Sequence, residues 1–131
     1  MNQAVRTALH TDRTIDILTT GAKTGLPRRT EIWFHNIDGR IIITGTPGAE
    51  GGKGGYKPRD WLANLKAHPR FTFCLKESLH AEIPARAVEI TDPADRRSIM
   101  SAPATQWYRD QVGSLEELVR YSPIVEVFFD E

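Results

Sequence analysis

The sequence predicts a mainly β protein of the α+β class, an antiparallel sheet of six strands closed or nearly closed into a barrel, with flanking helices. Two observations predict this class. Short stretches of alternating apolar and polar residues recur along the chain, and few helices separate them, which favours antiparallel over parallel pairing. At 131 residues, of which 40% are hydrophobic, the chain is expected to form a single domain over residues 1–131.

The expected strands are defined by period-2 alternation and by the turn residues between them. Two glycines and a proline in residues 21–27 must end the first strand. Asp38-Gly39 predicts a type I′ hairpin, because this turn needs positive φ at both central positions. The strands are expected over residues 14–20, 29–37, 40–44, 71–75, 79–90 and 124–129.

The expected helices are marked by capping residues and apolar spacing. Asp92 precedes a proline and an acid-rich first turn, and Ser114 opens a capping box with Glu117. Helices are expected over residues 1–10, 58–68, 92–100 and 114–120. Between the third strand and the mid-chain helix lies a glycine-rich loop, residues 46–57, whose length is typical of functional or disordered segments.

Composition excludes several classes of function. Seventeen basic and seventeen acidic residues give no net charge, so no nucleic-acid partner is expected. The lone cysteine, Cys74, excludes an intrachain disulfide and a Cys-based zinc site, and the four histidines lack ligand spacing, so no metal site is expected. The first ten residues lack the core of a signal peptide, and no apolar run approaches the roughly 18 residues of a membrane span. The cytoplasm is therefore the expected compartment.

The charge is unevenly distributed despite its zero sum. Residues 21–59 hold seven basic and three acidic side chains, whereas residues 113–131 hold one basic and five acidic ones. Lys23 and Arg28 lie on the glycine turn, where free backbone N–H groups also favour an anion such as phosphate. Lys53 and Lys57 lie on the glycine-rich loop. Phosphate binding and ordinary solvated turn charges both remain open on this spacing.

The usual motifs of protein-borne catalysis are missing. The chain has no P-loop, no Gly-x-Gly-x-x-Gly after a strand, and no nucleophile elbow. If the protein is an enzyme, a bound cofactor is therefore expected to carry the chemistry.

Two segments together resemble a known family. Residues 18–28 contain the turn Lys-Thr-Gly-x-Pro-Arg, and residues 61–69 read Trp-x-x-Asn-Leu-x-x-x-Pro. With Trp33 and Asp38-Gly39 between them, they resemble the deazaflavin (F420)-dependent nitroreductase and quinone reductase family, split β-barrel oxidoreductases of the flavin-binding group. The resemblance runs from residue 18 to residue 75 and is weaker beyond.

The resemblance implies a bound coenzyme F420 whose acidic tail lies in a cationic groove. Lys23 and Arg28 would hold its phosphate, and Thr24 and Gly25 would offer N–H groups. Thr46 and Gly48 would approach the same tail. Trp33 and Trp61 are equally explained as core anchors. The residues that the resemblance assigns to cofactor binding are Lys23, Thr24, Gly25, Arg28, Arg29, Trp33, Thr46, Gly48, Trp61 and Asn64.

The implied reaction is hydride transfer from the reduced cofactor to a quinone, nitro compound or other electron-poor small molecule. No catalytic side chain is assigned, although Tyr56, Tyr108 and Tyr121 are candidates for a general acid. Two alternatives stay open: an FMN-binding split-barrel oxidoreductase, and a non-catalytic flavin- or lipid-binding protein. Fold analogy adds a possible homodimer.

Overall fold

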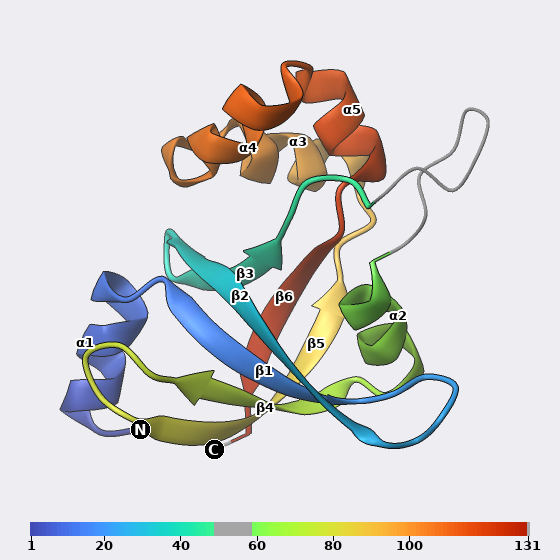
Figure 1. The fold of residues 1–131 in the computed structure, drawn as a ribbon. Coiled ribbons are helices and arrows are strands. Elements are labelled where there is room, and N and C mark those ends of the chain that lie inside the picture. The colour runs from blue at the N-terminus through green and yellow to red at the C-terminus, as the bar shows by residue number, and fades with distance from the viewer. Residues whose placement is uncertain (49–58, 131) are drawn as a thin grey trace.

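Six antiparallel strands form a barrel with helices packed against it, and the predicted fold class is confirmed (Figure 1). The computed structural model describes residues 1–48 and 59–130. The glycine-rich loop, with Lys53, Tyr56 and Lys57, lies outside the described residues apart from its first three positions. The strands follow the order β1-β2-β3-β6-β5-β4 around the barrel. Their bounds are Thr14–Thr20 (β1), Pro27–Ile37 (β2), Arg40–Thr44 (β3), Arg70–Leu75 (β4), Ala81–Glu89 (β5) and Ile124–Phe129 (β6).

Five α-helices and one 3-10 turn complete the described chain. Their bounds are Gln3–Thr11 (α1), Asp60–Ala67 (α2), Pro93–Ser101 (α3), Pro103–Thr105 (η1), Gln106–Val112 (α4) and Leu115–Tyr121 (α5). Within the described part of the chain, none of these helices has the length and apolar character that a bilayer span requires.

The hairpin and the helix caps form as the sequence predicts. Asp38 and Gly39 have φ values of 53° and 86°, as a type I′ turn requires. Asp92 accepts a hydrogen bond from the Asp95 N–H, and Ser114 accepts one from the Glu117 N–H. These local interactions are readable from sequence because each involves residues three positions apart or fewer.

Helix α4 is the element that sequence analysis missed. Its N-cap residue, Thr105, makes no capping hydrogen bond. The Thr105 hydroxyl instead donates to the Ile99 carbonyl, which ties the start of α4 to α3. Gly113 then ends α4 with a φ of 73°. The start of α4 therefore lacks a local capping signal, whereas Gly113 marks its end.

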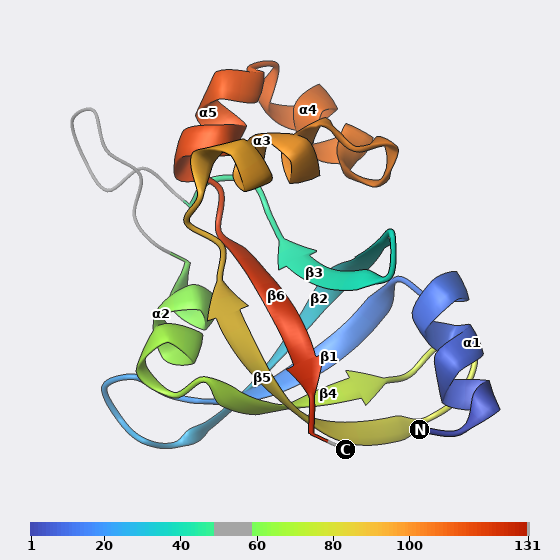
Figure 2. The ribbon, with the colours of Figure 1, turned by 180° about the vertical axis from the view of Figure 1, so that it is seen from behind.

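Two hydrophobic clusters lie on opposite faces of β3. Ile41 and Ile43 belong to the cluster inside the barrel, where Phe34 and Phe73 meet edge to face at 5.2 Å. Ile42 belongs to the second cluster, beneath α3, α4 and α5. These three helices form a layer above the barrel, as Figure 2 shows from behind. Since strand side chains alternate between faces, one strand supports both clusters.

Strand β2 is paired unequally on its two edges. Residues 27–33 pair with β1. Only residues 34–37 pair with β3, which then ends at Thr44. The two strands therefore diverge, and the edge of β2 before Phe34 has no partner in β3. This divergence is the split of the barrel.

Candidate functional site

The turn between β1 and β2 is closed by its own backbone. The Gly21 N–H donates to the Leu26 carbonyl at 2.8 Å, and the Gly25 N–H donates to the Gly21 carbonyl at 2.9 Å. A Cβ at Gly21 would lie 2.6 Å from Thr24 Oγ1 and 3.3 Å from the Leu26 oxygen, so the turn needs glycine there. Gly25 has a φ of +69°, in the left-handed region.

Asn64 fastens this turn to helix α2. Its Oδ1 accepts from the Ala22 N–H at 2.9 Å, and its Nδ2 donates to Thr19 Oγ1 at 3.4 Å. The resemblance assigned Asn64 to cofactor binding. In the structure both ends of its amide are engaged with the turn and with β1, so any effect on a ligand passes through the position of the turn.

Four of the predicted anion-binding residues lie on or beside this turn and are exposed. Lys23 and Arg28 form no ion pair with any described residue. The N–H groups of Lys23 and Thr24 make no hydrogen bond within the described part of the chain, whereas the N–H of Gly25 is used inside the turn. Two cationic side chains and two free N–H groups thus lie on or beside one exposed turn, a combination suited to an oxyanion.

The side chain of Arg29 lies on the opposite face of β2 from that of Arg28. Its guanidinium pairs with Asp16 at 3.1 Å, and Asp16 also accepts from the Lys76 ammonium at 2.8 Å. These partners, Lys76 first, lower the pKa of Asp16. Arg29 is therefore committed to a network on the outer face, and the structure does not bring it together with Lys23 and Arg28.

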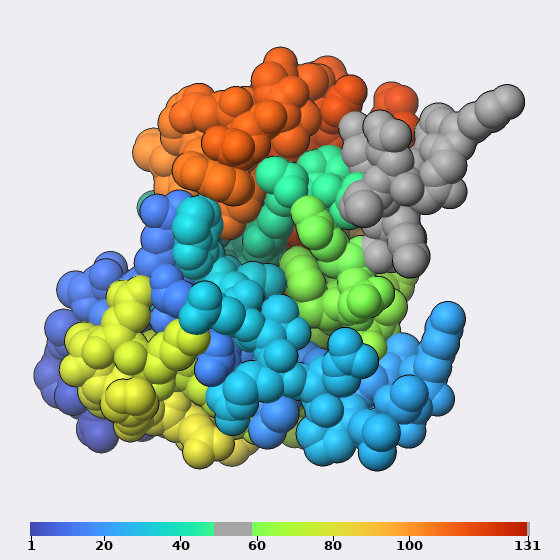
Figure 3. All heavy atoms as spheres, viewed as in Figure 1, coloured from blue at the N-terminus to red at the C-terminus, as the bar shows by residue number. Residues whose placement is uncertain are grey.

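A pocket of about 390 Å³ lies where β2 and β3 diverge. Figure 3 shows a hollow in this region, bordered by the upper helical layer, β2 and α2. Ligand pockets have volumes of about 300–1,000 Å³, so this one is large enough for a small molecule. Its lining comes from four separate segments: residues 30–33 of β2, residues 44–46 at the end of β3, Arg59 with Trp61 of α2, and Trp107 with Tyr108 of α4.

The unpaired edge of β2 presents backbone groups to this pocket. The Phe34 N–H donates to the Arg13 carbonyl on the β1 side. Because hydrogen-bonding direction alternates along a strand, the N–H and C=O groups of Glu31 and Trp33 face the opposite way, towards the opening. The pocket therefore offers donors and acceptors whose positions are fixed by the sheet.

All three tryptophans of the chain line this pocket. The rings of Trp33 and Trp107 meet edge to face at 5.0 Å, and the Arg13 guanidinium lies 3.9 Å above the Trp33 ring. Trp107 is 42% exposed, whereas Trp61 is buried in the barrel cluster. Trp61 is thus both a core anchor and a wall residue. An aromatic wall with fixed polar groups suits a planar ring system.

A buried hydroxyl lies beneath the aromatic wall. Tyr108 Oη and His35 Nε2 are 2.8 Å apart and share a hydrogen bond, and the hydroxyl lies 3.5 Å from the Thr44 carbonyl oxygen. Burial raises the pKa of Tyr108 to about 12 and lowers the pKa of His35 to about 4. Both groups are therefore neutral at physiological pH, and Tyr108 keeps its proton.

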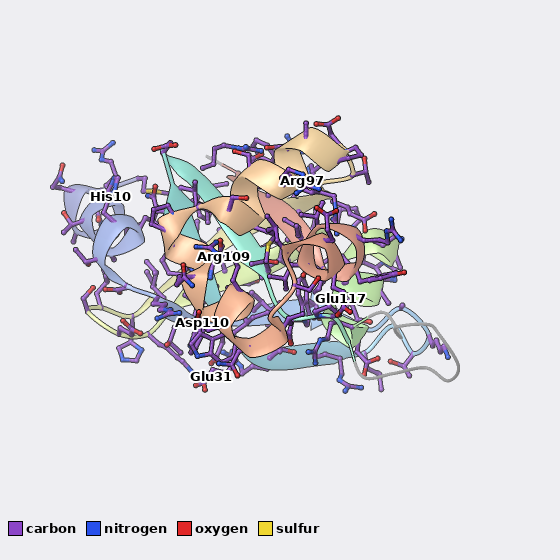
Figure 4. All side chains as sticks on the ribbon, turned by 90° about the horizontal axis from the view of Figure 1, so that it is seen from above. His10, Glu31, Arg97, Arg109, Asp110 and Glu117 are labelled. Carbon is purple, nitrogen blue, oxygen red and sulfur yellow. The ribbon has the colours of Figure 1, made fainter. Side chains whose placement is uncertain are left out.

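Arg109 and Arg59 each hold one border of the pocket in place. Arg109 donates to the carbonyls of Met100 and Ala102 and so fixes α4 against α3, within the helical layer that Figure 4 shows from above. Arg59 donates to the carbonyl and hydroxyl of Thr46 and to the carbonyl of Pro47. Thr46, a predicted tail contact, already uses its hydroxyl in this bond.

Arg59 and Trp107 also line the pocket, although the sequence patterns did not indicate them as site residues. Arg59 was noted only as part of a basic segment, and Trp107 lies on the uncapped helix α4. Gly48, assigned to the same tail as Thr46, is buried and lines a second pocket that borders Arg59. Among the tyrosine candidates, Tyr108 lines the opening, whereas Tyr121 lines the second pocket. Tyr56 lies outside the described residues.

Comparison with known proteins identifies the family. The model of the F420H(2)-dependent quinone reductase family matches residues 2–116, and the chain therefore belongs to this family. The resemblance stated from the sequence is confirmed at this level.

Solved structures show how widely the fold is shared. A conserved hypothetical protein from Mycobacterium tuberculosis aligns with a TM-score of 0.65 at 17% identity, over 100% of this chain and 82% of that one. A protein of the pyridoxinephosphate oxidase family from Clostridium acetobutylicum, related to general stress protein 26, aligns with a TM-score of 0.67 at 9% identity. The alignment covers 96% of this chain and 81% of that one. An F420-H2 dependent reductase (FDR-A) aligns with a TM-score of 0.52 at 17% identity, over 89% of this chain and 95% of that one. At these identities the likeness is one of fold.

The left-handed conformation of Gly25 predicts a defined cost of substitution. Gly25→Ala should lower the free energy of unfolding by about 1–2 kcal/mol, because an L side chain is strained at this φ. Gly113→Ala, at φ +73° and likewise with open space around its Cβ, is the matched control and should cost a similar amount. Urea unfolding of both variants measures this. Wild-type stability in Gly25→Ala would show that the turn has another conformation.

The buried His35 predicts a pH dependence of stability. The unfolded chain binds a proton near the ordinary pKa of 6.5, whereas folded His35 does so near 4. Stability should therefore fall as the pH drops through this window, by about 3 kcal/mol in total from this group. Urea unfolding between these pH values should show a shallower fall in His35→Gln than in the wild type. Parallel curves would contradict a neutral, buried histidine.

Proposed function

We propose that the protein is an F420-dependent oxidoreductase that reduces a quinone, a nitro compound or another electron-poor small molecule. The single observation that carries the proposal is the opening between β2 and β3, where three tryptophans and the free edge of β2 surround one pocket. Membership of the F420H(2)-dependent quinone reductase family supports the choice of cofactor.

The residues present fit the two parts of such a cofactor. A deazaflavin has a planar ring system and an acidic tail with a phosphate. The aromatic pocket suits the ring, and the turn with Lys23, Thr24 and Arg28 suits the tail. Arg28 precedes Thr30, a wall residue, by two positions on the same face of β2, which is about 7 Å along the strand. One strand thus connects the two parts of the site.

Each border of the pocket has a task in this proposal. The backbone groups of Glu31 and Trp33 orient the ring, and the indole of Trp107 excludes water from one side. Tyr108 holds a proton at its hydroxyl, kept there by the raised pKa. Bound in this opening, the deazaflavin supplies one chemistry, hydride transfer to the acceptor. No side chain is assigned to a catalytic step, because solvent can complete the protonation of the product.

Two other functions remain alternatives. FMN also combines a planar ring with a phosphate, so it meets the same aromatic wall and the same cations. A non-catalytic flavin- or lipid-binding protein would use the pocket without turnover.

We further propose a single domain over residues 1–131, a cytoplasmic location and no nucleic-acid partner. For a homodimer, the outer face of β5 and β6 offers exposed Val88 and Phe128.

The role of the turn predicts a selective loss of cofactor affinity. Arg28→Gln should weaken F420 binding about tenfold to a hundredfold, because it removes a charge-assisted contact of roughly 1.5–3 kcal/mol. Arg29→Gln should have a smaller effect, since Asp16 already holds that guanidinium. Arg86→Gln removes an exposed charge on β5 and serves as the control. Calorimetric titration measures all three. Unchanged affinity in Arg28→Gln would remove the turn from the site.

Turnover separates the proposal from its alternatives. The wild-type protein should steadily consume reduced F420 in the presence of menadione, followed by absorbance with oxygen excluded. Reduced FMN offered at the same concentration should be consumed more slowly. Faster use of FMN would favour the FMN-binding alternative, and cofactor binding without consumption would favour the non-catalytic one.

A further inference from the structure

A second pocket, of about 370 Å³, borders the first at Arg59. It lies between α2, α5 and the segments that lead into α3 and β6. Four cationic side chains line it, against one carboxylate, that of Glu89. The cationic residues are Arg59, Lys66, Arg96 and Arg120. An excess of positive charge around a concave surface favours an anionic ligand.

Two of these guanidinium groups are held by carbonyl oxygens. Arg96 donates to the carbonyls of Ile90, Val119 and Ser122 at 2.6–2.8 Å. Arg59 is held in the same way by the carbonyls of the first two residues of the glycine-rich loop. Carbonyls fix the position of a guanidinium without cancelling its charge. Neither arginine forms an ion pair with a carboxylate of the described residues. Burial accordingly lowers the pKa of Arg96.

Four other arginines of the chain are neutralised by a carboxylate. Arg29, Arg40, Arg70 and Arg97 each form an ion pair with an aspartate or glutamate. The arginines of the second pocket differ from these four, because no carboxylate of the described residues neutralises them. At its edge, the ammonium of Lys66 approaches Glu89 only to 3.7 Å, a distance typical of a weak pair.

A buried hydroxyl without a partner is part of the same pocket. Ser122 lines it and is 3% exposed. Its Oγ is buried and makes no hydrogen bond with any described residue. Buried hydroxyls nearly always find a partner, so an unused one beside a cationic pocket indicates a place for an acceptor.

We propose that the pocket between α2 and α5 is a second oxyanion site, which binds a ligand bearing carboxylate or phosphate groups. Fixed guanidinium groups, a buried hydroxyl and two exposed cations, Lys66 and Arg120, together match that chemistry. The shared wall at Arg59 places the ligand next to the aromatic opening. It is either the far end of the acidic cofactor tail or a separate anion. The site itself rests on these contacts and not on the proposed function.

Titration with inorganic phosphate, in the absence of any deazaflavin, tests the site. Backbone amide signals of residues 89–92, 94–96 and 120–122 should shift saturably in the NMR spectrum. Lys66→Gln/Arg120→Gln should weaken phosphate binding about tenfold, because both charges are lost. Glu89→Gln should tighten it severalfold by removing the only carboxylate among the described residues that line the pocket. These are exposed or half-exposed side chains, so the fold should persist.

Arg70→Gln/Arg86→Gln is the matched control, since it removes two exposed charges elsewhere and should leave phosphate binding unchanged. Absence of a saturable shift, or an equal loss in the control and in Lys66→Gln/Arg120→Gln, would overturn the proposal.

A second titration distinguishes the two sources of the anion. F420 with a long glutamate tail should lose affinity for Lys66→Gln/Arg120→Gln if the tail reaches this pocket, whereas a tail-free deazaflavin should not. If the wild type and Lys66→Gln/Arg120→Gln bind long-tailed F420 with equal affinity, the pocket holds a separate anion. If neither deazaflavin binds the wild type, the proposed function fails, but the phosphate titration still decides the existence of the second site.

Discussion

The early divergence of β2 from β3 is the constraint on which the site depends. A strand has two hydrogen-bonding edges, and an unpaired edge must be covered, solvated or used. Here β1 pairs with residues 27–33 of β2, whereas β3 pairs only with residues 34–37 of β2. The helical layer does not close the gap, because Trp107 of α4 only lines the opening and remains 42% exposed. Unused backbone groups and aromatic rings therefore meet in one opening, and a planar ligand can satisfy both.

The charge pattern follows the same geometry. On the outer face, Arg29, Asp16 and Lys76 neutralise one another and stabilise the sheet. At the turn and in the second pocket, the cations are held by backbone or left exposed, so their charge stays available. A protein of zero net charge thus carries two separate cationic regions. Local cationic regions of this kind favour acidic small molecules as ligands.

Much of the fold could be predicted from sequence because its signals are local. Asp38-Gly39 specifies its hairpin, and Asp92 and Ser114 specify two helix starts. The glycine turn was also readable, although the use of the Gly25 N–H inside it was not. Helix α4 and the pocket could not be predicted. The pocket depends on contacts between distant segments, such as Trp107 with Trp33. The start of α4 depends on the bond from the Thr105 hydroxyl to the Ile99 carbonyl, which is not a capping motif. The choice of F420 as the expected cofactor came from the family resemblance, because the spacing of residues alone does not identify a cofactor.

The central claim, that the opening between β2 and β3 receives the ring of the cofactor, has a direct test in the tryptophans. Every tryptophan of the chain lines this pocket, so the three indole N–H signals of an NMR spectrum all report on it. Addition of F420 should shift all three signals, with the exposed Trp107 most affected. Saturable binding of F420 that leaves the three indole signals unmoved would show that the ring lies elsewhere and would contradict the account.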